Sequence, residues 1–155
     1  MSRLTSLILL SGISLSPTTA IAQDKPATRY DAALAKSLGA DERGMRSYVF
    51  VVLKTGPTKV PIGEKRTQMF AGHMANIQRL ADEKKLVFAG PLDGIDGWRG
   101  IFIFAAPDIA TVKGYVSTDP VIINGEMVAE YHVLYGSAGL MLLNEISRKI
   151  SKESP

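Results

Sequence analysis

The chain contains no cysteine, and it has only two histidines and one tryptophan among its 155 residues. The absence of cysteine excludes disulfide bonds, thiol nucleophiles, iron–sulfur clusters and cysteine-ligated zinc. Burial of apolar side chains must therefore stabilise the fold. The sequence also lacks a P-loop and the patterns G-x-G-x-x-G, G-x-S-x-G and H-E-x-x-H. It thus gives no support to the nucleotide-binding, serine-hydrolase and zinc-protease classes that use those motifs.

Charge of either sign is modest, with 18 Lys and Arg against 15 Asp and Glu and a net charge of +3. The basic residues are scattered, and no basic run alternates with aromatic residues. Nucleic acid needs a concentrated basic surface, so we expect no nucleic-acid partner. Beyond the first residues, no stretch is apolar enough to cross a bilayer, so we expect no membrane association once the leader described next is removed.

Residues 1–22 have the three parts of a secretory signal peptide. Arg3 is the only charged residue before Asp24, an apolar stretch runs from Leu4 to Leu15, and Ala20-Ile21-Ala22 offers an A-x-A cleavage site. The alternative is an N-terminal membrane anchor, but the apolar stretch is well short of the roughly 20 residues that a span requires. We therefore expect cleavage after Ala22, export, and a periplasmic or secreted location.

The remaining chain divides into a central domain, residues 47–136, with an extension on each side. Residues 23–46 contain one short predicted helix, whose apolar face is Tyr30, Ala33, Leu34 and Leu38 and which Gly39 ends. Residues 137–155 contain an amphipathic helix from Leu140 to Lys152, with Leu143, Ile146 and Ile150 on one face. We expect this second helix to be structural and to pack on the Tyr30 helix or on another subunit.

The central domain alternates strand and helix patterns. Ser47–Lys54 is apolar and β-branched, which is typical of a strand buried on both faces. Strands are also expected over 86–92, 98–105 and 127–135, and helices over 67–84 and 108–117, with Asp119-Pro120 ending the second helix. The order β-α-β-β-α-β predicts an α+β, ferredoxin-like fold, in which both helices lie on one face of an antiparallel sheet. We expect a second sheet to cover the other face in a homodimer.

His73 and Asp119 are the candidates for acid/base chemistry. His73 shares a helical stripe with Phe70, Ile77 and Leu80, so it is either a hydrogen-bonded core histidine or a general base at a cleft. Asp119 is either a helix stop or a carboxylate whose direction the following proline fixes. A carboxylate beside an imidazole selects its tautomer and stabilises its protonated form, so the two residues together would suit proton transfer.

Three further positions are weaker candidates for substrate binding. Gly90 and Pro91 end the second strand, where glycine permits close backbone approach and proline bars further ladder pairing, although a plain strand end is an equal alternative. His132 shares a strand face with Glu130, which is either a half-exposed surface or a binding face. His73, Asp119 and His132 have the ligand types of a two-histidine, one-carboxylate metal site, but nothing in their spacing brings them together. We therefore expect neither a metal nor a cofactor.

Four segments then form a recognisable series: GHMAN at 72–76, LVFAGPL at 86–92, RGIFIF at 99–104 and TDP at 118–120. Their order and spacing resemble the YciI-like (YCII-related) domain family. The resemblance implies a ferredoxin-like, dimeric α-β barrel whose site holds a helix histidine and an Asp-Pro aspartate, here His73 and Asp119. Most members have no known reaction, and some resemble dehydrochlorinases or similar lyases acting on hydroxylated aromatics.

The chain departs from the family pattern in two places. It has Lys84 where the family usually has glycine, and it has His132-Val133-Leu134 where related members often have His-Pro-Trp. The leader and the two terminal helices lie outside the common domain. We expect these additions to be features of an exported subgroup.

Two functions of different classes fit these observations. One is a cofactor-independent enzyme in which His73 and Asp119 move protons on a small organic molecule, in a lyase-like or isomerase-like reaction. The other is a non-catalytic small-ligand-binding or assembly module of the periplasm. A ring-to-carboxylate contact of about 2.6–3.2 Å beside a pocket favours the enzyme. A histidine packed away from any pocket, with the aspartate turned to solvent, favours the module.

Overall fold

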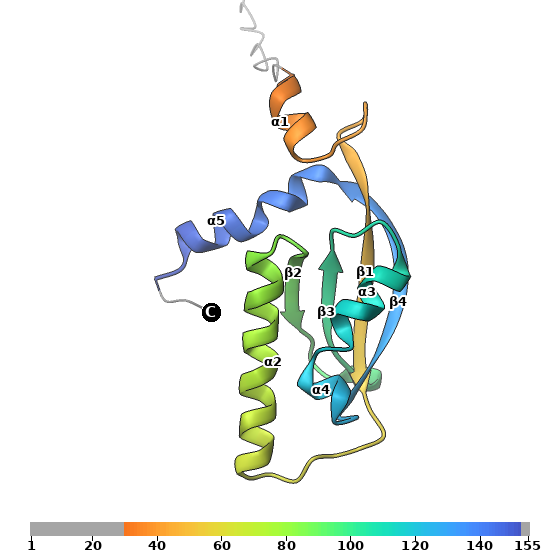
Figure 1. Ribbon diagram of the computed structural model, residues 1–155, viewed down its shortest axis with the longest axis vertical. Coiled ribbons are helices and arrows are strands. Elements are labelled where there is room, and N and C mark those ends of the chain that lie inside the picture. The colour runs from red at the N-terminus through yellow and green to blue at the C-terminus, as the bar shows by residue number, and fades with distance from the viewer. Residues whose placement is uncertain (1–29, 153–155) are drawn as a thin grey trace, which may run out of the picture. The chain divides into compact units, whose positions relative to one another are not determined.

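The computed structural model describes residues 30–152, which build a four-stranded antiparallel sheet with helices on one side (Figure 1). The expected signal peptide, residues 1–22, lies outside the described residues, as do 23–29 and 153–155. Within residues 30–152, no helix combines the length and the hydropathy that a bilayer crossing requires.

The sheet has the ferredoxin-like strand order. Its strands are β1 (Met45–Thr55), β2 (Leu86–Pro91), β3 (Trp98–Phe104) and β4 (Met127–Ser137), arranged β2-β3-β1-β4. Every neighbouring pair is antiparallel. The predicted β-α-β-β-α-β order and the α+β fold class are therefore confirmed.

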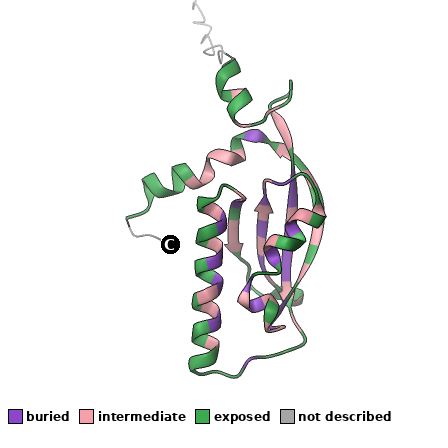
Figure 2. Ribbon diagram, in the orientation of Figure 1, coloured by how far each residue is buried: buried purple, intermediate pink, exposed green. Residues whose placement is uncertain are grey.

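Helices α2 (Glu64–Asp82) and α3 (Ile109–Val116) bury their apolar sides against one face of this sheet. The buried positions of α2 follow the side turned toward the strands (Figure 2). The core consists of alternate strand residues and inward helix residues, namely Val49, Val51, Leu53, Phe102 and Phe104 with Met69, Leu80, Val112 and Val116. The apolar residues at alternate strand positions thus pack against the apolar side of the helices in one continuous core.

The opposite face of β1 is also largely buried, as its apolar sequence predicts. Tyr48 and Val52 are buried within the single chain, and the Tyr48 hydroxyl donates a hydrogen bond of 2.9 Å to the carbonyl of Ser137. Around them, Phe50, Ile101 and Ile103 stay partly exposed. This second face is therefore apolar at its centre and incompletely covered by the described residues.

A helical turn between α3 and β4 corrects the sequence-based expectation for Asp119-Pro120. These residues do not simply end the second helix, because α3 stops at Val116 and Asp119 caps a further helix, α4 (Pro120–Ile123). The Asp119 carboxylate accepts a hydrogen bond of 3.1 Å from the Val121 N–H. Proline suits the first helical position because it has no N–H to leave unpaired and its φ is already helical.

Helix α2 also differs at its ends from the expected 67–84. It begins at Glu64, directly after Gly63, and it ends at Asp82. Lys84 follows with φ +56°, in the left-handed region that favours glycine. The family's usual glycine therefore has a conformational reason at this position, and lysine there costs about 1 kcal/mol.

The two terminal helices do not pack on each other, which was one of the two alternatives expected for the second helix. Helix α1 (Ala32–Ser37) is capped by Asp31 and buries none of its residues. A 3₁₀ turn (Ala138–Leu142) leads into α5 (Leu143–Ile150), so the predicted Leu140–Lys152 helix is α-helical only in its later part. Helix α5 packs on β2 rather than on the Tyr30 helix, and the Asn144 side-chain amide donates a 2.8 Å hydrogen bond to the Leu86 carbonyl.

Candidate functional site

His73 occupies the middle of α2 on the side turned to the sheet, and 9% of its surface is exposed. The Phe70 ring meets its imidazole edge-on with centroids 6.2 Å apart, and the Phe102 ring of β3 lies at 6.1 Å. The expected stripe is slightly rotated, because Phe70 and Ile77 are only partly buried while Met69 and Asn76 are buried. The two aromatic rings limit the orientations that the imidazole can take.

The Asp119 carboxylate lies directly against one nitrogen of that ring. His73 Nδ1 is 2.9 Å from Oδ1 and 2.8 Å from Oδ2, and Asp119 is only 1% exposed. An ionised carboxylate can only accept hydrogen bonds, so Nδ1 carries the hydrogen and a neutral ring has its lone pair on Nε2. The two candidates from the sequence are therefore in direct contact, across 46 positions of chain.

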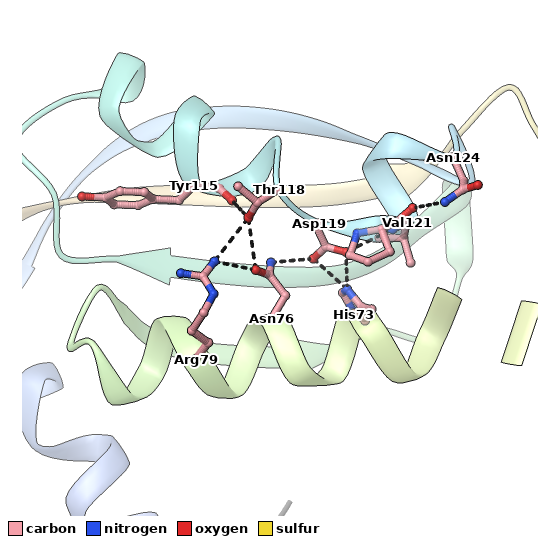
Figure 3. Close-up of polar contacts among 9 residues, drawn as sticks. His73, Asn76, Arg79, Tyr115, Thr118, Asp119, Val121 and Asn124 are labelled. Carbon is pink, nitrogen blue, oxygen red and sulfur yellow. Dashed lines mark hydrogen bonds and ion pairs between the residues drawn. The ribbon is translucent and has the colours of Figure 1, made fainter. Parts of the chain in front are cut away.

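Asn76 extends this contact into a polar chain (Figure 3). Its side-chain amide nitrogen lies 3.5 Å from Asp119 Oδ2, at the outer limit of a hydrogen bond. Its carbonyl oxygen accepts a hydrogen bond of 2.7 Å from Arg79 and one of 3.1 Å from the Thr118 hydroxyl. Those two donors fix the amide with its NH₂ group toward the carboxylate. Arg79 and Thr118 thus help to orient Asp119 through Asn76.

Asn76 is not among the sequence-based candidates, although the sequence contains a signal for it. It lies three residues after His73, on the same helix face, and a buried asparagine on an otherwise apolar stripe needs a polar partner. Arg79 and Thr118 gave no such signal, because both are exposed and their contacts depend on how α2 and the segment before α4 pack.

His73 also forms part of the wall of a cavity of about 740 Å³ between α2, the β2–β3 hairpin and α5. This volume is in the range of small-molecule sites. Gly90 and Pro91 line the same cavity, so the structure brings these two weaker candidates together with His73. Because Nδ1 is occupied by Asp119, the ring edge that carries Nε2 is the part left for a ligand. No described residue hydrogen-bonds to Nε2, and this nitrogen is not fully buried.

His132 lies elsewhere. It pairs with Phe50 on the sheet face turned away from α2, its Nε2 is 2.9 Å from Glu130, and half of its side chain is exposed. The sheet thus separates it from His73 and Asp119 within one chain. Among residues 30–152, no three His, Asp or Glu side chains come together as a set of metal ligands.

Comparison with known proteins places the chain in a family. A search of curated proteins returns no match. Among solved structures, the chain is similar to 5-chloro-2-hydroxyhydroquinone dehydrochlorinase (TftG) from Burkholderia phenoliruptrix AC1100, in complex with 2,5-dihydroxybenzoquinone. The identity is 20% and the TM-score 0.36, over 56% of this chain and 90% of that one, a likeness too distant to transfer any function. The pattern of the YCII-related domain matches residues 45–135, more than half of the sequence. The chain therefore belongs to the YCII-related domain family.

Proposed function

We propose that this protein is a cofactor-independent enzyme that uses His73 and Asp119 for acid/base chemistry on a small organic molecule. One observation carries the proposal: His73 lies in the wall of a cavity of ligand size, and a buried carboxylate behind it is 2.8 Å from its Nδ1. The distance falls in the range of about 2.6–3.2 Å that working acid/base pairs use. The Asp119 carboxylate is buried, rather than turned to solvent.

The geometry supports a proton transfer at Nε2. The neutral ring takes a proton from a ligand carbon or hydroxyl, and the positive charge that forms is stabilised by Asp119 on the other nitrogen. Return of the proton to another atom of the same molecule is an isomerisation. If instead the electron pair of the broken C–H bond forms a double bond while a leaving group departs with its own pair, the reaction is an elimination. Both reactions balance without a redox partner, so they are the two classes that we propose.

The alternative is a non-catalytic module that binds a small ligand or assembles with other proteins. It differs from the enzyme in one measurable respect: the cavity would hold a ligand and release it unchanged. A histidine held by a buried carboxylate beside the cavity favours the enzyme, because the carboxylate stabilises the protonated ring that forms when the histidine takes a proton.

The test combines a ligand screen with matched variants. A thermal-shift screen against small organic acids and phenols selects ligands, which are then incubated with the protein in deuterium oxide and analysed by NMR and mass spectrometry. We expect protein-dependent deuterium incorporation or an elimination product. His73→Gln and Asp119→Asn should each remove most of it, and the double variant should be little worse than either single one, because the two residues act as a unit.

His132→Gln is the matched control, since it changes the other histidine, on the opposite sheet face. It should leave turnover unchanged. Ligands that shift the melting temperature yet come back unlabelled and unaltered, in parent and variants alike, would identify a binding module instead.

We further propose that the protein is exported and that residues 1–22 are removed. The tripartite leader supports this. The intact mass of the protein recovered from the periplasm or medium decides the matter, because removal after Ala22 leaves Gln23 as the first residue. A mass that includes residues 1–22 would count against export by this route.

A further inference from the structure

The charged side chains that line the cavity beside His73 are of one sign. Among the described residues that line it, two are arginines, Arg99 and Arg148, and none is Asp or Glu. Most of the remaining wall is apolar, including Phe70, Phe88 and Phe102. Charge of one sign in a mostly apolar wall indicates a ligand that carries the opposite charge on an apolar body.

Arg99 is placed there by an irregularity of the sheet. Leu53 of β1 pairs with Gly100 and Lys54 pairs with Trp98, so Arg99 is the extra residue of a β-bulge. A bulge re-aims side chains relative to the regular alternation of a strand, and bulges are frequent beside active sites. The regular alternation of β3 turns Phe102 and Phe104 to the helix side, and the bulge alters that alternation at Arg99.

The Arg99 guanidinium also has no partner of its own within residues 30–152. Although Arg99 is half-buried, no ion pair or side-chain hydrogen bond of the described residues involves it. Glu126 is the acidic residue on which its charge acts, and that carboxylate is already bound by Arg66 at 2.6 Å and by the Val60 N–H at 2.7 Å. The guanidinium nitrogens of Arg99 are not fully buried, so a carboxylate in the cavity can reach a guanidinium that has no ion pair of its own among the described residues.

Arg148 differs from Arg99 in each of these respects. It lies on α5, 59% of its side chain is exposed, and Asp82 is 3.7 Å away. An exposed arginine with an acidic neighbour contributes little to the recognition of an anion.

We propose that the cavity takes a small aromatic or alicyclic carboxylate, with the carboxylate on Arg99 and the ring against the apolar wall. This inference rests on the proposed function, since it assigns the substrate class of the same site. The planar guanidinium can hold a carboxylate through two parallel hydrogen bonds. Such an anchor fixes the ring at one end, so that its far side can present a hydrogen to Nε2 of His73.

The test uses two probes of the same shape, para-hydroxybenzoate and para-hydroxybenzamide, titrated calorimetrically into the purified protein. We expect the carboxylate to bind at least about tenfold more tightly than the amide, which corresponds to about 1.4 kcal/mol, because a hydrogen bond between two charged groups is stronger than one to a neutral amide. Arg99→Met should abolish that preference and Arg99→Lys should retain part of it. Arg148→Met is the matched control and should leave the preference intact.

Equal binding of the two probes by the parent protein would overturn the inference, as would a preference that survives Arg99→Met. No detectable binding of the carboxylate to the folded parent would also overturn it. The comparison of probes in the parent needs no variant to fold. The two proposals also fail separately: a carboxylate that binds through Arg99 but is never deprotonated leaves this inference standing and the enzyme refuted. Turnover that needs His73 but not Arg99 would support the enzyme and refute this inference.

Discussion

A Cβ atom added to Gly72 would lie 2.9 Å from Cγ of Pro120, closer than real Cβ contacts come. The bare backbone of α2 therefore packs directly on the proline ring that opens α4. The two residues are the chain neighbours of His73 and Asp119, so their contact sets the separation of the histidine and the carboxylate.

Gly72→Ala should push α4 away from α2. Overpacking of this kind costs about 1–3 kcal/mol of unfolding free energy, and we expect a lower melting temperature and a lengthened His73–Asp119 contact. Gly114→Ala in α3 is the matched control, since nothing lies within 4 Å of the added carbon. That change should stabilise the protein by about 0.5–1 kcal/mol. Equal effects of the two substitutions would show that the packing on Pro120 is not tight.

The tautomer of His73 is a direct test of its contact with Asp119. In the parent protein at alkaline pH, the ring ¹⁵N chemical shifts should show hydrogen on Nδ1 and a free lone pair on Nε2. Asp119→Asn keeps the shape but offers an NH₂ group in place of an oxygen, so this tautomer should lose its dominance. Asp108→Asn, at the N-cap of α3, should leave the His73 shifts unchanged. An Nδ1-protonated ring in Asp119→Asn would contradict the assignment.

Glu126 should make the fold sensitive to acid. Burial raises the pKa of this carboxyl group, but the hydrogen bonds from the Val60 N–H and the Arg66 guanidinium together lower it by more than burial raises it. The pKa in the folded state is therefore below the ordinary 4.5. The unfolded chain then binds more protons than the folded one as the pH falls below about 4.5. The stabilisation by Glu126 is therefore complete above that pH and is lost as the pH falls through the folded-state pKa.

Denaturant unfolding at pH values on either side of this range measures the effect. Glu126→Gln should lower stability at neutral pH and flatten its decline in acid. Glu130→Gln is the control: its pKa is also lowered, first by its hydrogen bond with Lys54, but the group is exposed and contributes little to stability. An acid limb in Glu126→Gln as steep as in the parent would assign the sensitivity to other groups.

The incompletely covered sheet face should mediate a homodimer. Light scattering on the parent protein at micromolar concentration should give twice the mass of the chain, because Phe50, Ile101 and Ile103 form an apolar surface that a second sheet can cover. Ile103→Lys places a charge in that surface and should yield folded monomers. Ile62→Lys, at a loop position that is 94% exposed, should remain dimeric. A monomeric parent would rule the interface out.

The order of the elements was predictable because it depends on local pattern, namely strand alternation and helical stripes. Local pattern also drew attention to His73 and Asp119 one by one, but the resemblance to the YCII-related family was needed to join them in one site. The Asp119-Pro120 pair predicts a helix stop, but the first turn of a helix also tolerates proline, and α4 begins there. The contacts of Arg79 and Thr118 were not predictable, since no local pattern encodes side chains that meet across 39 positions. For His132, alternation with Tyr131 indicated two opposite faces, but not which of them α2 covers.

The separation of His73 and Asp119 in the chain has a consequence for how the site comes into being. The histidine belongs to the first β-α-β half of the domain and the aspartate to the second, with the β2–β3 hairpin between them. During synthesis, the first half carries a histidine without an acceptor until the second half has docked. In the finished protein, α4 is only four residues long, and Val121 within it is fully buried in the core, so the turn that carries the carboxylate is held by packing between the two halves. The acid/base pair is thus a property of how the two halves dock.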